Sequence, residues 1–561
     1  MEGRAGGDLA HRAIQSPVAT AVALALIAAL AYANSLLNGF TLDDAAIILS
    51  NPLVHSLTGV WRAFAHPYWP EPWGWGQYRP LAIASFTVQW WLGGGAPWVF
   101  HLVCIAWHAT ACVLVWRLLS AWLAPAGAAF GALWFALHPV HVEAVASVVG
   151  QTELMAAVFV LAACLAHRRG QRIAALWFAL ALLSKESGIV FLGLAVAIDL
   201  KDGARRVALY VRYGVVAALY AACLVILFES QPLSKIAPTW AGATAGERWL
   251  TMLTVVPQYV QLLVAPTTLH MDYGPRVIEL ATAVTPQVVV GAGLLVLLVL
   301  AAVAARKRAP MVTLGLAWIA IAIAPVANVL FPAGVVMAER TMYLPSVGAA
   351  LLAGWVAYWL SERAPRAAAA LAAACAVAFA ARTWTRTPVW HDDIALTLAA
   401  LHDSPTSYKA HHAAGVLFAQ TGHWTEAANE YRYARWLFPL DVEPYRGGAE
   451  AALVAHDYDA AAALLDSARL LAPRRFSPWI RLADVRFKQE RWREAGALAF
   501  GAYEMSPDSL RALGIAINAN VRAGDIREAA SIVKRGLADH PGDERLRRES
   551  VFVAGLPGKK P

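Results

Sequence analysis

Long apolar runs fill the first two thirds of the chain, and short polar or basic segments separate them. A membrane-spanning helix needs roughly 17–25 predominantly apolar residues, so the shorter runs reach this length only with their flanking residues. The pattern therefore predicts about eleven spans, with boundaries that are soft by several residues. The predicted ranges are 17–37, 97–116, 124–138, 152–167, 172–184, 186–200, 207–228, 286–305, 311–330, 345–361 and 367–384.

Basic residues gather in alternate connections between these runs. Cytoplasmic loops of membrane proteins are enriched in Lys and Arg, so eleven crossings predict a cytoplasmic N-terminus. The loop 38–80, the segment after His138, the stretch 229–285 and the C-terminal third then lie outside the cytoplasm. The basic positions are Arg4, Arg12, 167–172, 201–206, 306–308, Arg363 and Arg366.

The last third of the chain repeats with a period of 34 residues. Prolines recur at Pro405, Pro439, Pro473, Pro507 and Pro541, and alanines at Ala427, Ala461, Ala495 and Ala529. This period and the closing proline are typical of tetratricopeptide repeats, which stack into a solenoid with a concave face. We predict an all-α protein in which a polytopic membrane helix bundle precedes an α-solenoid. The predicted domains are a membrane domain at 1–385, a half-repeat junction at 386–407, four repeats at 408–545 and a tail at 546–561.

The composition agrees with this division. Charged residues make up 15% of the chain, against about 25% in soluble domains, so a wholly soluble globular protein is excluded. The net charge of +8 is explained by basic loops, and no nucleic-acid partner is predicted. All five cysteines lie in apolar stretches, which excludes a disulfide framework and a CxxC zinc site. The low-lysine, alanine-rich composition favours a bacterial inner membrane.

Two adjacent carboxylates, Asp43 and Asp44, follow the first apolar run directly. They could begin a solvated loop or cap a helix. Packing explains paired acids at a membrane surface poorly, so we favour a general base whose pKa is raised by burial and a like-charged neighbour. The same loop ends in Tyr78-Arg79-Pro80-Leu81.

A second polar cluster, His138, His141 and Glu143, leaves the third apolar run, and Glu153 follows it. A metal site is one interpretation, but the spacing differs from HExxH and no third pair of ligands is evident. We therefore predict no metal ligands. Ionisable residues at membrane depth are functional by default, which favours a helix that lines a substrate.

Two further clusters bring cations to the same predicted side. Lys185 precedes Glu186, so the two could form an ion pair, or Lys185 could face a phosphate. Arg340 follows Glu339 and precedes Tyr343. An unpaired charge at this depth is expensive, so Arg340 either pairs with Glu339 or binds a lipid-linked phosphate, which suits guanidinium geometry.

Taken in order, these segments resemble the transmembrane and tetratricopeptide repeat-containing O-mannosyltransferase family of the C-type glycosyltransferase superfamily. The resemblance covers about residues 17–541, and the ordered set is more specific than any one motif. The motifs are Leu42-Asp43-Asp44 with Asn51-Pro52, Tyr78-Arg79-Pro80-Leu81, His101 with His108, 138–145, Ser184-Lys185-Glu186, 262–266 with Asp272-Tyr273, and Glu339-Arg340 with 343–346.

The resemblance implies a polyprenyl-phosphate donor carrying mannose and, as acceptor, a Ser or Thr hydroxyl of a protein outside the cytoplasm. It also implies contact with membrane lipid and repeats that bind the acceptor or a partner. Asp43 or Asp44 then matches the catalytic acid, and Arg340, Lys185 and Arg79 are candidates for holding the donor phosphate. The residues expected to line the substrate are His138, His141, Glu143, Glu153, Glu186, Glu339 and Tyr343.

One position departs from the family pattern, since Gln151 stands where an Arg is expected. That substitution leaves a different lipid-linked sugar open. No cofactor follows from the residues, and a need for a divalent cation is left open. The alternative function is a non-catalytic scaffold whose repeats recruit partners for envelope or secretion assembly.

Overall fold

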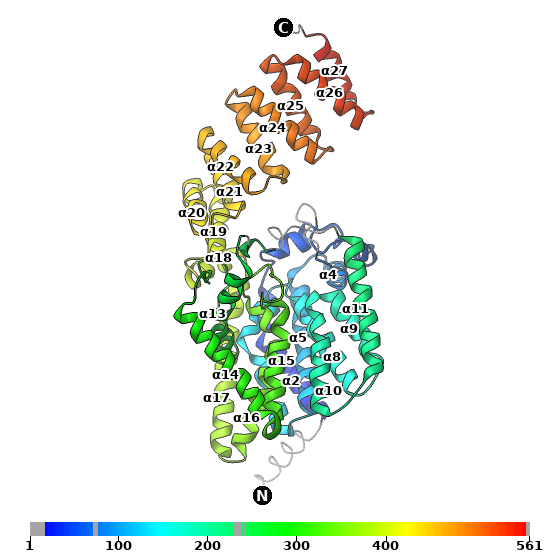
Figure 1. Cartoon of the computed structure of the whole chain (residues 1–561), viewed down its shortest axis with the longest axis vertical. Coiled ribbons are helices and arrows are strands. Elements are labelled where there is room, and N and C mark those ends of the chain that lie inside the picture. The colour runs from blue at the N-terminus through cyan, green and yellow to red at the C-terminus, as the bar shows by residue number, and fades with distance from the viewer. Residues whose placement is uncertain (1–16, 71–76, 229–236, 241, 557–561) are drawn as a thin grey trace. The chain divides into compact units, whose positions relative to one another are not determined.

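The computed structural model describes residues 17–70, 77–228, 237–240 and 242–556. Arg4 and Arg12 of the orientation argument lie outside these residues. Within the described ranges the chain forms helices and turns, and the one β-pairing is an isolated bridge between Pro275 and Ile278. Two compact units follow each other along the chain, Met1–Pro405 and Thr406–Pro561 (Figure 1). The predicted all-α class is confirmed.

Each of the eleven predicted apolar ranges overlaps an α-helix of unit 1. These helices are α2 (Pro17–Ala31), α5 (Pro97–Leu119), α6 (Pro125–Leu137), α8 (Gln151–Arg168), α9 (Ala174–Ser184), α10 (Phe191–Asp202), α11 (Val207–Leu227), α14 (Pro286–Arg308), α15 (Pro310–Ile323), α16 (Pro345–Ser361) and α17 (Pro365–Arg386). Between them lie α4 (Pro80–Gly93), α7 (Val142–Ala146) and α13 (Ala245–Val264), and α18 (Asp393–Asp403) ends the unit.

The predicted count of about eleven spans is not confirmed. In the described residues, four helices are long and apolar enough to cross a membrane, namely α5, α11, α14 and the segment Pro365–Trp390 that contains α17. The pair α6 and α7, bent by 46°, would be a fifth. The helix α9 has 11 residues, and at about 1.5 Å per residue it is shorter than the roughly 30 Å hydrocarbon core.

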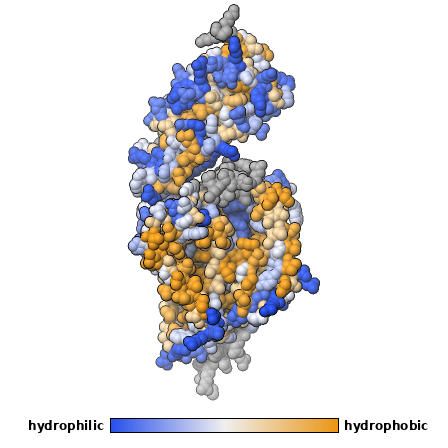
Figure 2. Space-filling view, viewed as in Figure 1, coloured by the Kyte–Doolittle hydropathy of each residue, from blue (hydrophilic) through white to orange (hydrophobic). Residues whose placement is uncertain are grey.

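The long apolar helices turn most of their surface away from the protein. Only 11% of the most apolar window of α11, of α14 and of the α17 segment is buried inside the molecule, against 44% for α5. Figure 2 shows hydrophobic side chains spread over this unit, whereas the repeats are mostly hydrophilic. Apolar surface of this extent needs a non-aqueous neighbour, so these helices face lipid.

Glycines allow α16 to pack against two neighbours at backbone distance. A Cβ atom on Gly354 would lie 2.4 Å from the carbonyl oxygen of Gly127 on α6. At a second crossing, a Cβ atom on Gly348 would lie 2.5 Å from the carbonyl oxygen of Gly315 on α15. Small residues at such crossings are the usual means of close helix packing in membranes. The helix α16 is therefore fixed between α6 and α15.

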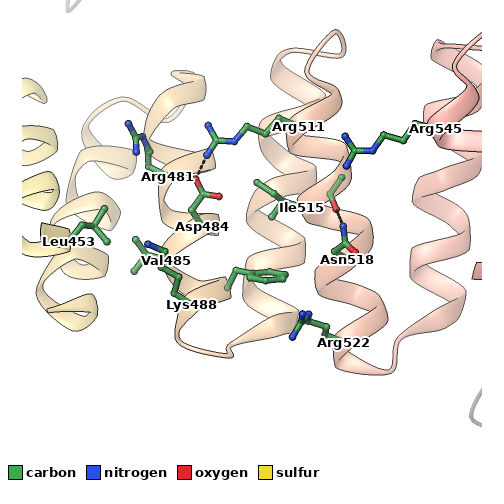
Figure 3. Close-up of a pocket in the computed structure, with 12 residues that line it drawn as sticks. Leu453, Arg481, Asp484, Val485, Lys488, Arg511, Ile515, Asn518, Arg522 and Arg545 are labelled. Atoms are coloured by element: carbon green, nitrogen blue, oxygen red, sulfur yellow. Dashed lines mark hydrogen bonds and ion pairs between the residues drawn. The ribbon is translucent and has the colours of Figure 1, made fainter. Parts of the chain in front are cut away.

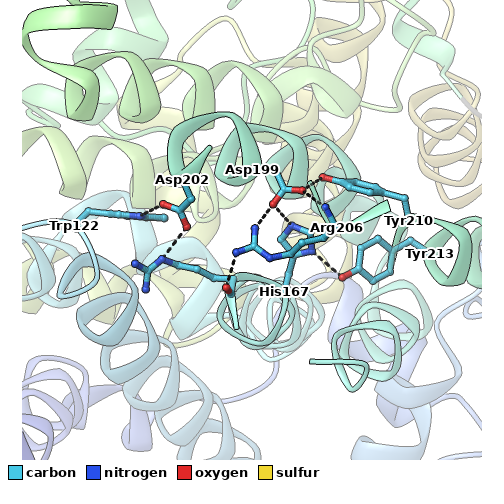
Figure 4. Close-up of polar contacts among 8 residues, drawn as sticks. Trp122, His167, Asp199, Asp202, Arg206, Tyr210 and Tyr213 are labelled. Atoms are coloured by element: carbon cyan, nitrogen blue, oxygen red, sulfur yellow. Dashed lines mark hydrogen bonds and ion pairs between the residues drawn. The ribbon is translucent and has the colours of Figure 1, made fainter. Parts of the chain in front are cut away.

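A polar network fastens α8, α10 and α11 at one end of unit 1 (Figure 4). Asp202 accepts hydrogen bonds from Nε1 of Trp122, at 3.2 Å, and from Nε of Arg168, at 3.1 Å. Asp199 is shared by three partners, His167, Arg206 and Tyr210. The carboxylates thus neutralise basic side chains in the segments that the sequence analysis assigned to the cytoplasm. That assignment stays a prediction.

Unit 2 is a series of paired helices. The pairs are α19 (Tyr408–Gln420) with α20 (Trp424–Leu437), α21 (Glu443–Val454) with α22 (Tyr458–Leu471), α23 (Phe476–Lys488) with α24 (Trp492–Met505), and α25 (Leu510–Ala523) with α26 (Ile526–Asp539). A further helix, α27 (Glu544–Ala554), follows them. The four periodic alanines, Ala427, Ala461, Ala495 and Ala529, are fully buried. The predicted repeat solenoid is therefore confirmed.

Candidate functional site

The paired aspartates lie just before the short helix η2 (Ala45–Leu49) and have opposite environments. Asp44 is fully buried. Its Oδ2 accepts a hydrogen bond from the backbone N–H of Thr41 and its Oδ1 one from that of Val149, both at 2.9 Å. Asp43 is exposed. Asp44 therefore ties the loop to the start of α8, and Asp43 presents its carboxylate at the surface.

The backbone next to Asp43 is strained. Leu42 has φ of +48°, a left-handed conformation that costs a non-glycine residue about 1–3 kcal/mol. Its backbone N–H donates to Oδ1 of Asp393 at 2.9 Å. Such strain persists only where surrounding contacts impose it, and it concentrates at functional sites. The conformation therefore fixes where Asp43 lies.

Burial raises the pKa of Asp44 to about 7. The hydrogen bonds from Thr41 and Val149 act in the opposite direction, and the negative charge of Asp43 adds to the rise. The expected combination of burial and a like-charged neighbour therefore acts on the second carboxylate of the pair. The carboxylate that can reach a substrate is the first.

Three ion pairs each join a predicted phosphate-binding cation to a predicted lining carboxylate. Together with Asp43 they form what we call the charged cluster. Its ion pairs are Arg340 with Glu143, Lys185 with Glu153, and Arg79 with Glu186. All seven residues were expected from the sequence, but these pairings were not.

Neighbours in sequence do not pair in the cluster. Lys185 has extended backbone angles, and Glu186 begins the short helix η5 (Glu186–Val190), so the two side chains have different partners. Lys185 therefore reaches Glu153, while Glu186 accepts two hydrogen bonds from the Arg79 guanidinium, at 2.6 and 3.0 Å. Desolvation alone would raise the pKa of Glu186, but the charge and hydrogen bonds of Arg79, together with the charge of Lys185, lower it to about 2.

Glu339 is likewise separate from Arg340. It accepts hydrogen bonds from the backbone N–H of His270, at 2.5 Å, and from the hydroxyl of Tyr273, at 2.9 Å. Burial and the charge of Glu143 raise the pKa of Glu339 to about 8. Of the two interpretations of Arg340, pairing with Glu339 is thus wrong, because adjacent side chains on the short helix η8 (Glu339–Met342) diverge.

Arg340 is the most accessible cation of the cluster. Its side chain is 38% exposed, against 12% for Lys185 and 10% for Arg79. Its backbone N–H also donates to Glu143 at 2.7 Å. The carboxylates of Glu143 and Asp43 both raise the pKa of Arg340, so the two lie within electrostatic reach of its guanidinium. An exposed acid and a partly exposed guanidinium therefore lie near each other.

The histidines lie in a buried layer that supports Arg340. Nδ1 of His138 accepts a hydrogen bond from Val140, and its Nε2 lies 3.3 Å from the carbonyl oxygen of Leu263. Nε2 of His141 lies 2.8 Å from the hydroxyl of Ser346, at the start of α16. All of these polar side chains are fully buried. Their observed contacts hold backbone segments in place.

Tyr343 belongs to the same layer. Nδ1 of His108 accepts a hydrogen bond from the Tyr343 hydroxyl at 2.8 Å, because Nε2 of His108 is directed to the carbonyl oxygen of Ala136. Gln151, the departure from the family pattern, is buried and donates to the hydroxyl of Ser85 at 2.7 Å. A neutral hydrogen bond thus replaces the expected cationic contact.

Sequence reasoning missed two contributors to the site. Asp393 holds the strained Leu42, although it lies about 350 residues further along the chain. The Arg79 guanidinium lies 4.9 Å from the ring centroid of Tyr68, a cation–π contact that helps to orient it. The aromatic-rich loop that carries Tyr68 was a signal for this contact. Across the described ranges, no group of three or more His, Cys, Asp or Glu side chains could hold a metal ion.

Comparison of the sequence with known proteins supports the family resemblance. No family model matches. The "Protein O-mannosyl-transferase F38B6.6" of Caenorhabditis elegans is 27% identical over 427 residues, which cover 73% of this chain and 61% of that protein. The human "Protein O-mannosyl-transferase TMTC3" is 24% identical over 542 residues, covering 85% and 59%. The chain thus spans about three fifths of the length of these relatives.

A shorter region is more similar. The "Protein O-mannosyl-transferase Tmtc2" of Drosophila melanogaster is 34% identical over 283 residues, which cover 44% of this chain and 30% of that protein. The resemblance indicated by the motifs is therefore confirmed over most of the chain.

Among solved structures, YrrB, described as a TPR protein with an unusual peptide-binding site, is 14% identical, with a TM-score of 0.25. The match covers 31% of this chain and 84% of that one. The protein MamA is 18% identical, also with a TM-score of 0.25, covering 28% and 85%. At scores this low, the solenoid assignment rests on the helix pairs of the chain itself.

Proposed function

We propose that this chain is a membrane glycosyltransferase that transfers mannose from a polyprenyl-phosphate donor to Ser or Thr hydroxyls of proteins. The similarity to relatives named protein O-mannosyl-transferases supports this function. The observation that carries it is the charged cluster, in which the exposed Asp43 shares a surface with Arg340 beside helices long enough to span a membrane. A polyprenyl donor would reach that surface from the bilayer.

Asp43 is the general base of this proposal. Its carboxylate takes the proton of the acceptor hydroxyl while the hydroxyl oxygen attacks the anomeric carbon of the sugar. The bond between that carbon and the phosphate oxygen breaks, and its electron pair leaves with the phosphate, so the configuration inverts. Asp44 is unsuited to this role, because each of its oxygens already accepts a backbone hydrogen bond inside the protein.

Arg340 holds the charge of the departing phosphate. A guanidinium offers paired N–H donors that match phosphate oxygens, and its partial exposure lets a ligand reach it. Lys185 and Arg79 are more buried, so they act on the phosphate mainly by electrostatic attraction and not by direct contact. The phosphate is a good leaving group once its charge is neutralised, so a general acid is not required.

The proposal is tested by two aspartate variants in membranes supplied with the lipid donor and an acceptor protein. We expect Asp43→Asn to lower transfer by about 10²–10⁴-fold, the usual contribution of a general base. Asp44→Asn should instead lower stability, since it removes one of two acceptors of buried N–H groups. Glu279→Gln, an exposed acid of unit 1 outside the cluster, is the control. Unchanged transfer by Asp43→Asn would exclude the proposed base.

We propose that the chain lies in a bacterial inner membrane with its N-terminus in the cytoplasm. Asp43 and the repeats then lie outside the cytoplasm. The basic segments of the sequence support this orientation.

A further inference from the structure

The repeats contain a groove that the proposed transfer reaction does not use. The cavity has a volume of about 700 Å³, and Figure 3 shows side chains of α23 and α25, together with Arg545 of α27, arranged along it. Its apolar surface comes from Leu453, Val485 and Ile515. The remaining lining residues are Arg481, Asp484, Phe487, Lys488, Arg511, Gly514, Asn518, Arg522 and Arg545.

The charge of this lining is strongly one-sided, with five cations and one carboxylate. The cations also follow the repeat. Lys488 and Arg522 are 34 residues apart, as are Arg511 and Arg545, so each pair occupies equivalent positions of successive repeats. Equivalent positions of stacked repeats face the same way. The groove therefore carries two rows of positive charge.

Part of this charge is neutralised within the unit. Arg511 forms an ion pair with Asp484 at 2.5 Å, Arg481 one with Glu450 at 2.9 Å, and Arg545 one with Glu549 at 3.2 Å.

Lys488 and Arg522 contact aromatic rings instead. The Arg522 guanidinium lies 5.4 and 5.0 Å from the ring centroids of Phe487 and Trp492. The Lys488 ammonium lies 5.6 Å from that of Tyr458. Among the described residues these two cations form no ion pair, so they carry the surplus charge of the groove.

We infer that this groove binds an acidic, extended segment of a partner protein. Carboxylates match the two rows of cations, and Arg forms paired hydrogen bonds with them. The apolar residues between the rows can accept the aliphatic parts of the same segment. A single-stranded nucleic acid would need open aromatic faces on which bases stack, and Arg522 covers those of Phe487 and Trp492.

This inference goes beyond the proposed transfer reaction and does not rest on it. The test uses the purified full chain in phosphatidylcholine nanodiscs, which carry no net charge. A fluorescein-labelled peptide of alternating Glu and Ser residues is the probe, and its binding is followed by fluorescence anisotropy. The same peptide with Gln in place of Glu and a labelled single-stranded RNA are compared with it.

Matched double variants locate the binding. The groove variant is Lys488→Gln with Arg545→Gln, and the control variant is Arg493→Gln with Arg535→Gln. Arg545 and Arg535 are equivalent, because each pairs with an acid four residues on at 3.2 Å and is about two-thirds exposed. Only Arg545 lines the groove. Both variants remove two positive charges from the repeats.

We expect the Glu peptide to bind at least tenfold more tightly than the Gln peptide. The groove variant should weaken this binding about tenfold or more, and the control variant less than twofold. Equal loss in both variants, or no preference for Glu, would overturn the inference. So would tighter binding of the RNA with the same dependence on the groove residues.

Discussion

Replacement of Arg340 by Gln separates its observed role, as partner of Glu143, from its proposed role, as ligand of the donor phosphate. Loss of one member of a fully buried ion pair costs about 3–5 kcal/mol. Here the Glu143 side chain is 4% exposed but that of Arg340 is 38% exposed, and the backbone N–H of residue 340 still donates to Glu143. Solvent and this remaining bond reduce the expected loss to about 2 kcal/mol.

This loss is measurable as a thermal shift. An unfolding entropy of about 2.1 cal/mol/K per residue converts it to a decrease of roughly 2–3 °C in the melting temperature of unit 1. The 23 Trp residues provide an intrinsic fluorescence signal in detergent. We expect the double variant Glu143→Gln with Arg340→Gln to recover most of this stability, because it leaves no unpaired buried charge.

Transfer activity should not recover with stability. The double variant still lacks the cation, so we expect an apparent KM for the lipid donor at least tenfold above that of the unmodified chain. If the double variant restored both the melting temperature and KM, Arg340 would act only as a structural partner of Glu143. A melting temperature unchanged by Arg340→Gln alone would refute the energetic argument for the pair.

Three further predictions concern pH, helix packing and topology. The pKa of Asp44 is raised to about 7 in the folded state from about 3.9 when unfolded, so the folded state binds an extra proton and stability should fall as pH rises from about 4 to 7. Asp44→Asn should flatten that part of a plot of melting temperature against pH, and an unaltered slope would contradict the prediction. Gly354→Leu should destabilise unit 1 by more than about 2 kcal/mol through its contact with Gly127, whereas the same change at Gly293, where a Cβ meets nothing, should have little effect on the melting temperature. A cysteine at the exposed Ala463 position should react with a membrane-impermeant maleimide in intact spheroplasts, and labelling only after lysis would place the repeats inside.

The sequence was sufficient to predict the helices, but it was insufficient to predict which of them are long enough to cross a membrane. Period and composition predicted the helices of both units, because apolar runs and a 34-residue repeat leave few other folds. Crossing a membrane depends in addition on the length of each unbroken helix. The helix α9 ends at Ser184, before its apolar run could reach the required length, and no compositional count detects such an end.

The candidate site shows a similar division. Composition and motif order identified the members of the charged cluster, because ionisable residues beside apolar runs are few. Their pairing could not be predicted, since Arg340 and Glu143 are 197 positions apart and only the packed helices bring them together. The different environments of Asp43 and Asp44 also arise from a distant contact, the hydrogen bond from Val149.

The close packing of α16 between α6 and α15 has a consequence for how sequences of this kind can diverge. Arg340 lies only five residues before α16, and Ser346 at the start of that helix is anchored to His141. The guanidinium therefore takes its position from the interior of the bundle. Insertions or deletions along α16 should therefore be poorly tolerated, because a register slip of one residue would displace the proposed phosphate ligand.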